Sequence, residues 1–266
     1  MELYIRPEQK VDHYQVEELT REAFWQFWEP QRKICDEHLL VHKLRKTATL
    51  IPELNLVAVH EDRIVGHIIY SKSKIVATNG LTYETLIFGP LSVLPQFQNQ
   101  GIGRRLLNHS FKIARDMGFR AIIIFGVPDY YPRIGFKRAT DFGLLSHTGR
   151  APDAFLAYPL YEDALAGLQG HYHYDPVYDQ LNEDEALEFD KRFPAKEFFR
   201  PTDIEVLLKR LTPSARHAVE SLNGSSLQYL TSKSQREIAS LPGIDLIAIE
   251  TIKQVMAENN MLWGEK

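Results

Sequence analysis

The sequence predicts an α/β domain, a mixed and twisted central sheet flanked by helices, followed by a small all-α domain. Apolar, β-branched runs alternate with amphipathic segments as far as Tyr158, which is typical of a mixed α/β domain. Two of these runs, residues 55–60 and 64–75, are separated by a short polar turn and indicate a hairpin. From Thr202 onward, apolar residues recur only at helical spacing.

The other elements of the α/β part follow from local patterns. Residues 121–125 are all apolar, which is typical of a buried central strand, and Gly118 is a suitable C-cap for the helix before it. In chain order we expect a strand at 3–5, helices at 11–28 and 35–46, the hairpin, a strand at 82–94, a helix at 104–117, a strand at 121–125, a short helix or turn at 129–134 and a strand at 154–158.

Composition excludes several classes of protein. The chain has 266 residues, 44% of them apolar and 25% charged, which is ordinary for a globular protein of one large or two modest domains. A net charge of −4 gives no reason to expect general affinity for nucleic acid or membranes. One cysteine, Cys35, excludes an intrachain disulfide and a thiolate zinc cluster. With no signal-peptide pattern and no long apolar run, we expect a cytoplasmic protein.

A glycine-containing turn, QNQGIG at residues 98–103, joins the strand at 82–94 to the helix at 104–117. The start of a helix exposes unpaired backbone N–H groups and positive potential, which suit a phosphate. The Rossmann fingerprint would need a third glycine where Leu106 stands, and no Gly-Lys-Ser/Thr of a P-loop occurs. The turn instead fits the pattern Q/R-x-x-G-x-G/A.

That pattern is the pyrophosphate-binding signature of the GNAT superfamily of N-acetyltransferases, which the chain resembles. The stretch GPLSVLP at residues 89–95, followed by the turn, is similar to motif A of that superfamily. The stretch YYPRIGF at residues 130–136 is similar to its motif B, Y-x-x-x-G-F. Residues 161–170 and 189–194, with Pro128, resemble the YhbS-like bacterial subgroup. The resemblance implies the GNAT fold and use of acetyl-CoA as co-substrate, without a metal.

The resemblance also implies a binding site. The backbones of Leu91 and Val93 would pair with the pantetheine arm like an added strand. Arg104 could add a charge-assisted contact or be an ordinary solvated helix residue. The residues implied as the pyrophosphate cradle are Gln98, Asn99, Gln100, Gly101, Ile102, Gly103 and Arg104.

Catalytic roles are assigned by the same resemblance. Tyr131 stands four residues before Gly135, where the superfamily often has the tyrosine that protonates the leaving thiolate, and a phenol is protonated at neutral pH. The alternative is that Tyr131 only packs against the cofactor, which is the role we expect for Tyr130. Glu84 is the candidate general base, with an exposed strand-end charge as the alternative, and His67 is a second candidate.

Three other groups of residues have side chains that can carry chemistry. Cys35 is interpreted as a core thiol rather than an acyl-enzyme nucleophile. His38 and His42 are spaced for one helix face, but no HExxH pattern accompanies them, so a helix surface is favoured over a metal site. His171 and His173 are candidates to line a substrate opening.

We place a domain boundary near residues 200–201, giving an acetyltransferase domain with its extension at 1–197 and a helical domain at 202–266. Helices are expected at 204–211, 213–222, 234–239 and 247–259, with Thr212 and Ser232 or Ser234 as N-caps. Segments 211–216, 230–234 and 241–245 resemble the C-terminal domain of the bacterial RNA polymerase α subunit, which contains a helix-hairpin-helix. Asp245 replaces the second hairpin glycine, and from Glu205 onward seven basic residues balance seven acidic ones, which favours a protein-interaction or dimer role over DNA contact.

The predicted function is transfer of acetyl from acetyl-CoA directly to a primary amine of a small molecule or peptide, with Tyr131 as the general acid. The alternative is a regulatory protein that senses acyl-CoA and contacts DNA, polymerase or a protein partner through its helical tail. A different acyl donor or an oxygen acceptor is the third interpretation. The residues of the expected acceptor pocket do not select one amine, and a homodimer stays open.

Overall fold

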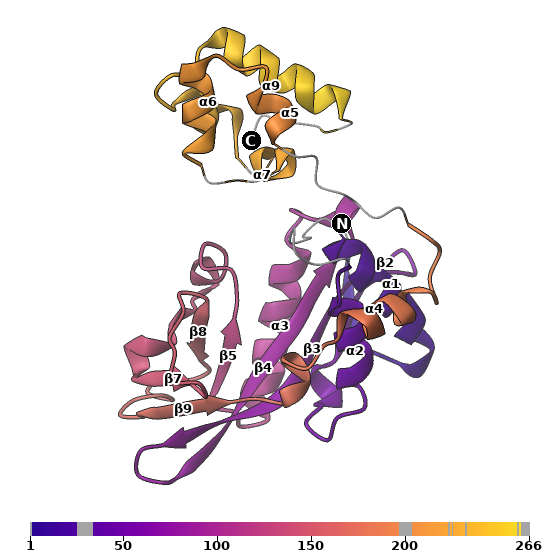
Figure 1. The fold of residues 1–266 in the computed structure, drawn as a ribbon. Coiled ribbons are helices and arrows are strands. Elements are labelled where there is room, and N and C mark those ends of the chain that lie inside the picture. Colours follow the sequence, from indigo (N-terminus) through magenta and orange to yellow (C-terminus); the bar gives the residue numbers. More distant parts are fainter. Residues whose placement is uncertain are drawn as a thin grey trace. The chain divides into compact units, whose positions relative to one another are not determined.

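The computed structural model describes residues 2–25, 34–196, 204–222, 224, 226–231, 233–259 and 261 (Figure 1). The chain divides into two compact units, Met1–Lys196 and Glu197–Lys266. We describe each unit by itself. Within the described residues, no helix is both long and apolar enough to cross a membrane.

A nine-stranded sheet forms the centre of the N-terminal unit. Seven strands follow the order β1-β2-β3-β4-β5-β8-β6, β9 pairs with the far part of β3, and β7 pairs with β9. Only β4–β5 and β7–β9 are parallel. The strands are β1 (Tyr4–Pro7), β2 (Leu56–His60), β3 (Arg63–Ala77), β4 (Thr82–Val93), β5 (Ala121–Phe125), β6 (Lys137–Arg138), β7 (Leu144–Ser146), β8 (Phe155–Pro159) and β9 (Gly170–His173).

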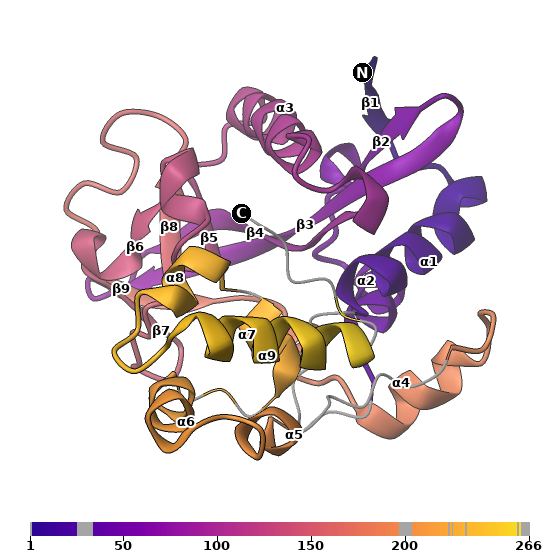
Figure 2. The ribbon, with the colours of Figure 1, turned by 90° about the horizontal axis from the view of Figure 1, so that it is seen from above.

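Helices cover both faces of this sheet (Figures 1 and 2). On one face lies α3 (Ile102–Asp116), where Gly66 of β3 permits close approach, because a Cβ there would meet Ile102 at 2.9 Å. The other face carries α1 (His13–Phe24) and α2 (Glu37–Leu44), and the buried hydroxyl of Ser92 in β4 donates to Thr20 of α1 at 3.1 Å. Gly66 of β3 therefore allows α3 to pack closely on one face, and Ser92 of β4 helps to hold α1 on the other.

Most of the expected elements are present, and the differences lie at polar, short strands. The wholly apolar run at 121–125 is β5, and Gly118 ends α3 with a φ of +84°. The segment expected as an extension contains β9, in which only Gly170 and Tyr172 are buried, so its sequence lacks an apolar pattern. Strands β6 and β7 and helix α7 were not predicted either. Residues 26–28 of the first expected helix lie outside the described residues.

After β9 the chain returns across α1 and α2 and holds them through buried ion pairs. Asp190, at the end of α4 (Glu183–Asp190), accepts from Arg21 Nε at 2.5 Å and Nη2 at 2.7 Å. His38 Nε2 of α2 lies 3.2 Å from the same carboxylate. Because the Arg21 side chain is only 1% exposed, this carboxylate compensates a guanidinium charge that water cannot reach.

The C-terminal unit has its own apolar core, to which each helix among its described residues contributes and which includes Leu207, Val219, Leu230, Ile238 and Ile252. Side chains cap three of these helices: Thr212, Ser234 and Asp245 each accept from a backbone N–H in the first turn. Ser232 lies outside the described residues. The helices are α5 (Glu205–Leu208), α6 (Pro213–Glu220), α7 (Leu227–Thr231), α8 (Gln235–Ala239) and α9 (Leu246–Glu258).

The Asp190 carboxylate supports a stability prediction. Burial alone would raise the pKa of Asp190, but the bonds from His38 and Arg21 outweigh burial and hold that pKa below its ordinary value. A carboxyl whose pKa is lowered by folding stabilises the fold above its unfolded-state pKa of about 3.9. That contribution is lost as the pH falls through the folded-state pKa.

We expect Asp190→Asn to lower the free energy of unfolding at pH 7 by about 3 kcal/mol, since it leaves Arg21 buried without its partner. The difference from the wild type should begin to shrink below about pH 4, where the carboxyl of the unfolded chain takes up a proton, and should vanish only below the lowered folded-state pKa. Urea denaturation at both pH values measures this. The matched control is Glu188→Gln, which removes an exposed ion pair with Lys191 and should cost less than 1 kcal/mol. Equal losses for the two variants would contradict the account.

Candidate functional site

The site begins where β4 separates from β5. These parallel strands are in register at one pair, Leu86 with Ile122, and β5 ends at Phe125. Beyond that pair β4 contains a β-bulge, in which Gly89 and Pro90 together face the single residue Ile69 of β3. A bulge bends its strand, so the second half of β4 diverges from β5 and leaves a gap in the sheet.

Along this second half, two residues direct their backbone groups into the gap. Leu94 N–H donates to Val65 O of β3 at 3.0 Å, so Leu94 faces β3. Hydrogen-bonding direction alternates along an antiparallel ladder. Val93 and, two residues earlier, Leu91 therefore point their N–H and C=O groups away from β3. Leu91 and Val93 therefore lie on an open strand edge, and their pairing with a pantetheine arm stays a prediction.

The glycine turn follows β4 directly, and two of its residues have left-handed backbone conformations. Gly101 has a φ of +80° and Asn99 a φ of +60°, both in the left-handed region. The first helical bond runs from Arg105 N–H to Gly101 O at 3.0 Å, so the N–H groups of Ile102, Gly103 and Arg104 have no partner within the helix. A Cβ on Gly101 would have no atom within 4 Å, so the space beside this residue at the start of α3 is open.

Two contacts join the turn to the gap. Gln98 Nε2 donates to Val93 O at 3.1 Å and ties the turn to the end of β4. A Cβ on Gly103 would lie 3.4 Å from Tyr130 Oη and 3.5 Å from Leu91 Cδ2. The turn, the open edge of β4 and the motif B loop therefore meet at Gly103. Gln100, which was also expected in the pyrophosphate cradle, donates from its side-chain amide to Gln96 O.

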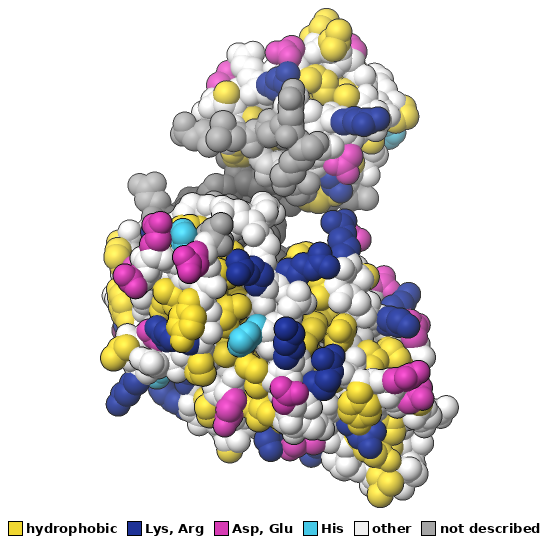
Figure 3. All heavy atoms as spheres, turned by 180° about the vertical axis from the view of Figure 1, so that it is seen from behind, with side chains coloured by type: hydrophobic (Ala, Val, Ile, Leu, Met, Phe, Trp, Pro, Cys, Tyr) yellow, Lys and Arg dark blue, Asp and Glu magenta, His cyan; other side chains and the backbone are white. Residues whose placement is uncertain are grey.

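The exposed face of α3 is basic. Figure 3 shows Lys and Arg side chains gathered on this view of the N-terminal unit. Arg104, Arg105, Lys112 and Arg115 are the exposed cations of the helix. The charge of Arg104 also acts on Tyr130, whose pKa is nevertheless raised by burial. Positive charge thus flanks the start of α3, where the helix dipole already favours an anion.

Tyr131 lies beside the gap in an aromatic group. Its ring centroid is 5.8 Å from that of Phe88 in β4 and 5.4 Å from that of Phe136. A Cβ on Gly126 would meet the Tyr131 ring at 2.5 Å, so glycine lets this ring lie over the end of β5. Burial raises the pKa of Tyr131 well above 10, and Tyr130 adds to the shift, so the phenol stays protonated.

Of the two candidate general bases, Glu84 lies far from these residues and His67 lies close to them in β3. Glu84 stands near the start of β4, seven residues before Leu91 or roughly 23 Å along the strand, and pairs with Lys72 at 2.9 Å. His67 is fully buried, and its Nε2 bonds to Asn55 Oδ1 at 2.7 Å. Burial lowers the pKa of His67 to about 4, so it is neutral. Glu84 is therefore distant from the group around Gly103, whereas His67 pairs with Ser92, between Leu91 and Val93, and has its ring bonded to Asn55.

The remaining candidates from the sequence have structural partners. The Cys35 thiol is buried, which raises its pKa and makes it unreactive. His42, expected on a helix surface, bonds to the buried Glu17 at 2.9 Å, and His38, expected there too, is fully buried beside Asp190. Among the described residues, no group of three His, Cys, Asp or Glu side chains could hold a metal ion.

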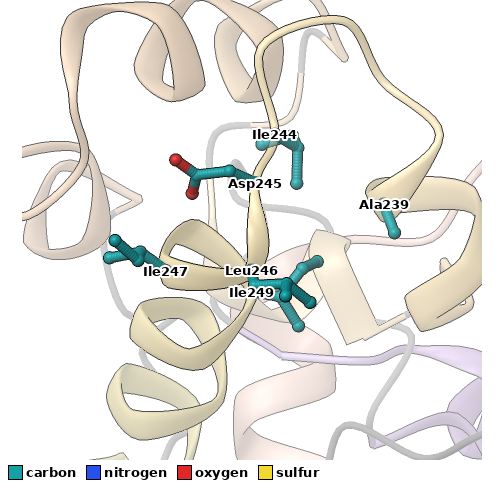
Figure 4. A pocket seen from close by; sticks show the side chains of 6 residues that line it. All are labelled: Ala239, Ile244, Asp245, Leu246, Ile247 and Ile249. Atoms are coloured by element: carbon teal, nitrogen blue, oxygen red, sulfur yellow. The ribbon is translucent and has the colours of Figure 1, made fainter.

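The C-terminal unit has a separate apolar pocket (Figure 4). It has a volume of about 560 Å³ and lies at the hairpin between α8 and α9. Leu246 is 84% exposed and Ile247 74% exposed at the start of α9. Asp245 uses one carboxylate oxygen to cap α9 at Ala248 N–H. The lining residues are Ala239, Ile244, Asp245, Leu246, Ile247 and Ile249.

Comparison with known proteins gives the class of the N-terminal unit. Residues 17–139 match the model of the acetyltransferase (GNAT) family. The chain is 28% identical over 173 residues to an uncharacterized N-acetyltransferase, YhbS of Escherichia coli (strain K12), a match covering 65% of this chain and 96% of that protein. It is 34% identical over 100 residues to the uncharacterized N-acetyltransferase YjhQ of the same strain, a match covering 37% of this chain and 54% of that protein.

Two crystal structures have a similar fold. That of YhbS from Escherichia coli in complex with CoA has a TM-score of 0.59 and 25% identity, covering 68% of this chain and 93% of that one. That of a GNAT family acetyltransferase from Brucella melitensis in complex with acetyl-CoA has a TM-score of 0.53 and 27% identity, covering 67% and 99%. The predicted GNAT fold and N-acetyltransferase class are confirmed. The polymerase resemblance of the tail stays a prediction.

Proposed function

Because the N-terminal unit has the GNAT fold and belongs to the N-acetyltransferase class, we propose that it transfers acetyl from acetyl-CoA directly to a primary amine. The reaction takes place in the gap between β4 and β5. When bound, the co-substrate supplies the reactive thioester. The chain's own residues orient it, hold its phosphates and provide a proton.

The pyrophosphate binds at the start of α3. The N–H groups of Ile102, Gly103 and Arg104 have no helical partner, and the space over Gly101 is open. Phosphate oxygens at this position accept from these amides and gain from the helix dipole. Gln98, Asn99 and Gln100 shape the preceding turn, and Gln98 fixes it to β4. The exposed cations of α3 add attraction for a polyanion.

Leu91 and Val93 hold the pantetheine arm. Their outward N–H and C=O groups stand one residue apart on an open edge, so an extended amide chain can bond to them as an added strand. This pairing aligns the arm with the gap and fixes where the thioester lies. Positioning of this kind can lower a barrier by several kcal/mol.

Tyr131 acts as the general acid. The amine nitrogen forms a bond to the thioester carbon while the carbon–sulfur bond breaks. Tyr131 gives its proton to the departing sulfur and takes one back from the new amide nitrogen, so the protons balance without a separate base. The raised pKa of Tyr131 keeps this hydroxyl protonated through the neutral and mildly alkaline range. Glu84 has no role in this proposal.

Tyr130, expected only to pack, gains a binding role here. Its hydroxyl lies beside Gly103, at the junction of the turn and the open strand edge, and its ring is 41% exposed. We assign it a hydrogen bond to the pyrophosphate end of the co-substrate. Sequence alone did not indicate this, because the contact depends on how the motif B loop approaches α3.

The observation that carries the proposal is the convergence at Gly103. Three segments that are separate in the sequence, namely the open edge of β4, the turn before α3 and the loop after β5, approach within 3.9 Å of one glycine position. A strand edge that accepts an amide chain and a helix start that accepts phosphate are adjacent there. Together they match a ligand with an amide arm on a pyrophosphate.

We propose a second, separate function for the C-terminal unit: contact with a protein partner, a second copy of the chain being the simplest. The exposed Leu246 and Ile247 help to line an apolar pocket, so two copies can pack these side chains against each other reciprocally. The balanced charge of this unit and the carboxylate of Asp245 disfavour the phosphates of DNA.

Gly101→Val should weaken acetyl-CoA binding at least tenfold, because valine tolerates a φ of +80° poorly and fills the open space at the start of α3. Isothermal titration calorimetry measures this. Gly80→Val is the matched control, since Gly80 has a φ of +84° and is equally open but lies in the β3–β4 hairpin. Unchanged affinity for Gly101→Val would contradict the placement of the pyrophosphate.

Tyr131→Phe should lower kcat by about 100-fold with little change in affinity for acetyl-CoA, as loss of a general acid does. Tyr130→Phe should instead raise the KM for acetyl-CoA and change kcat little. Steady-state kinetics with varied acetyl-CoA and a fixed amine separates the two. A kcat for Tyr131→Phe equal to that of the wild type would exclude Tyr131 as the acid.

The full chain should form a dimer that weakens at least tenfold in the double variant Leu246→Ser, Ile247→Ser, because both side chains lose apolar burial. Sedimentation velocity over a range of concentrations measures the association. A monomeric wild type that retards duplex DNA at low salt would instead favour the DNA-contacting alternative.

A further inference from the structure

A row of aromatic rings crosses the gap on the side that the co-substrate machinery does not use. Phe125, the last residue of β5, stacks on Phe155 with ring centroids 5.1 Å apart. Its other ring neighbour is Tyr174, just after β9, at 5.6 Å. Tyr174 in turn meets Tyr178 edge-on at 5.9 Å. We call Phe125, Tyr174 and Tyr178 the aromatic row.

The far end of the aromatic row reaches the bulge of β4. A Cβ on Gly89 would lie 3.9 Å from Tyr178 Cε1, and Tyr178 Oη lies 3.1 Å from Ser71 Oγ of β3. The aromatic row therefore extends from the last residue of β5 to the first bulged residue of β4. These two residues border the gap from its two strands, so the aromatic row crosses it.

Tyr131 is on the opposite face of the sheet. Neighbouring residues of a strand point to opposite faces. Tyr131 packs on Phe88, whereas Tyr178 approaches the next residue, Gly89. At β5, Tyr131 lies at Gly126, as does the side chain of Ile124, whereas Tyr174 meets Phe125. The general acid and the aromatic row thus border the same gap from its two sides.

We infer that the acceptor is a primary amine that carries an aromatic ring, and that it enters on this face and packs its ring against Phe125 and Tyr174. The inference rests on the proposed acetyl transfer. Direct transfer requires the amine nitrogen to reach the thioester within the gap, about 3 Å from the carbon. Of the two faces, the one opposite Tyr131 offers a surface beside that point.

The side chains of the aromatic row favour an acceptor that carries an aromatic ring. Phe125 is 41% exposed, although it has ring neighbours, so an apolar group placed on it gains burial. Aromatic pairs at these separations add to the gain from burial alone. An aliphatic ring of equal size would bury similar area without the aromatic pairing.

The nearby carboxylates are already engaged, which disfavours a polyamine. Asp179 accepts from Tyr174 Oη at 3.1 Å. Asp175 accepts from Thr49 Oγ1 at 2.7 Å and from Val177 N–H at 3.0 Å. A second ammonium group on the acceptor would therefore compete with these bonds for its counter-charge.

The test compares three acceptors with the full-length enzyme: 2-phenylethylamine, 2-cyclohexylethylamine and spermidine. We expect kcat/KM to be about tenfold higher for the phenyl compound than for the cyclohexyl one. Phe125→Leu should remove that preference by raising the KM for 2-phenylethylamine, while the affinity for acetyl-CoA by calorimetry stays unchanged. Tyr161→Leu, at an exposed tyrosine outside the aromatic row, is the matched control and should keep the preference.

The outcomes separate this inference from the proposed function. Equal rates for the phenyl and cyclohexyl amines, or a preference for spermidine, with acetyl-CoA bound normally, would overturn the aromatic acceptor and leave acetyl transfer standing. A preference that survives Phe125→Leu would overturn the role of Phe125 in binding the ring. Absence of acetyl-CoA binding would overturn both proposals.

Discussion

The separation of β4 from β5 is the constraint on which the rest of the site depends. A sheet normally pairs both edges of an inner strand, and an unpaired buried edge costs free energy. Here the bulge at Gly89 and Pro90 turns β4 away after one registered pair with β5. The open edge that results can bond to an extended ligand. The same separation leaves one gap that is bordered by residues on both faces of the sheet.

The other parts of the N-terminal unit keep this gap in place. Helix α3 approaches β3 closely at Gly66, which fixes the amide-bearing turn beside the open edge. On the other face, the segment after β9 returns over α1 and α2, and Asp190 compensates the buried Arg21. The same segment contains Tyr174 and Tyr178, so one stretch of chain both stabilises the helices and lines the gap opposite Tyr131.

The parts of the site that the sequence predicts are those with local physical requirements. Gly101 must have a positive φ, and the glycine turn must precede a helix, so motif and geometry agree. Glu84 illustrates the opposite case, because its distance from Leu91 follows from the length of strand between them and not from any local pattern. Tyr130 and the aromatic row could not be predicted, since their contacts join segments far apart in the sequence. The fold shows the same division: apolar runs predicted the central strands, while β9 has too few buried residues to be recognised.

A crystal structure of the full chain with acetyl-CoA tests the central claim most directly. We expect pantetheine amides bonded to the backbones of Leu91 and Val93, the pyrophosphate at the N–H groups of Ile102 to Arg104, and the sulfur within reach of Tyr131 Oη. Acetyl-CoA bound with its arm away from the open edge of β4, or with its pyrophosphate away from the start of α3, would contradict it.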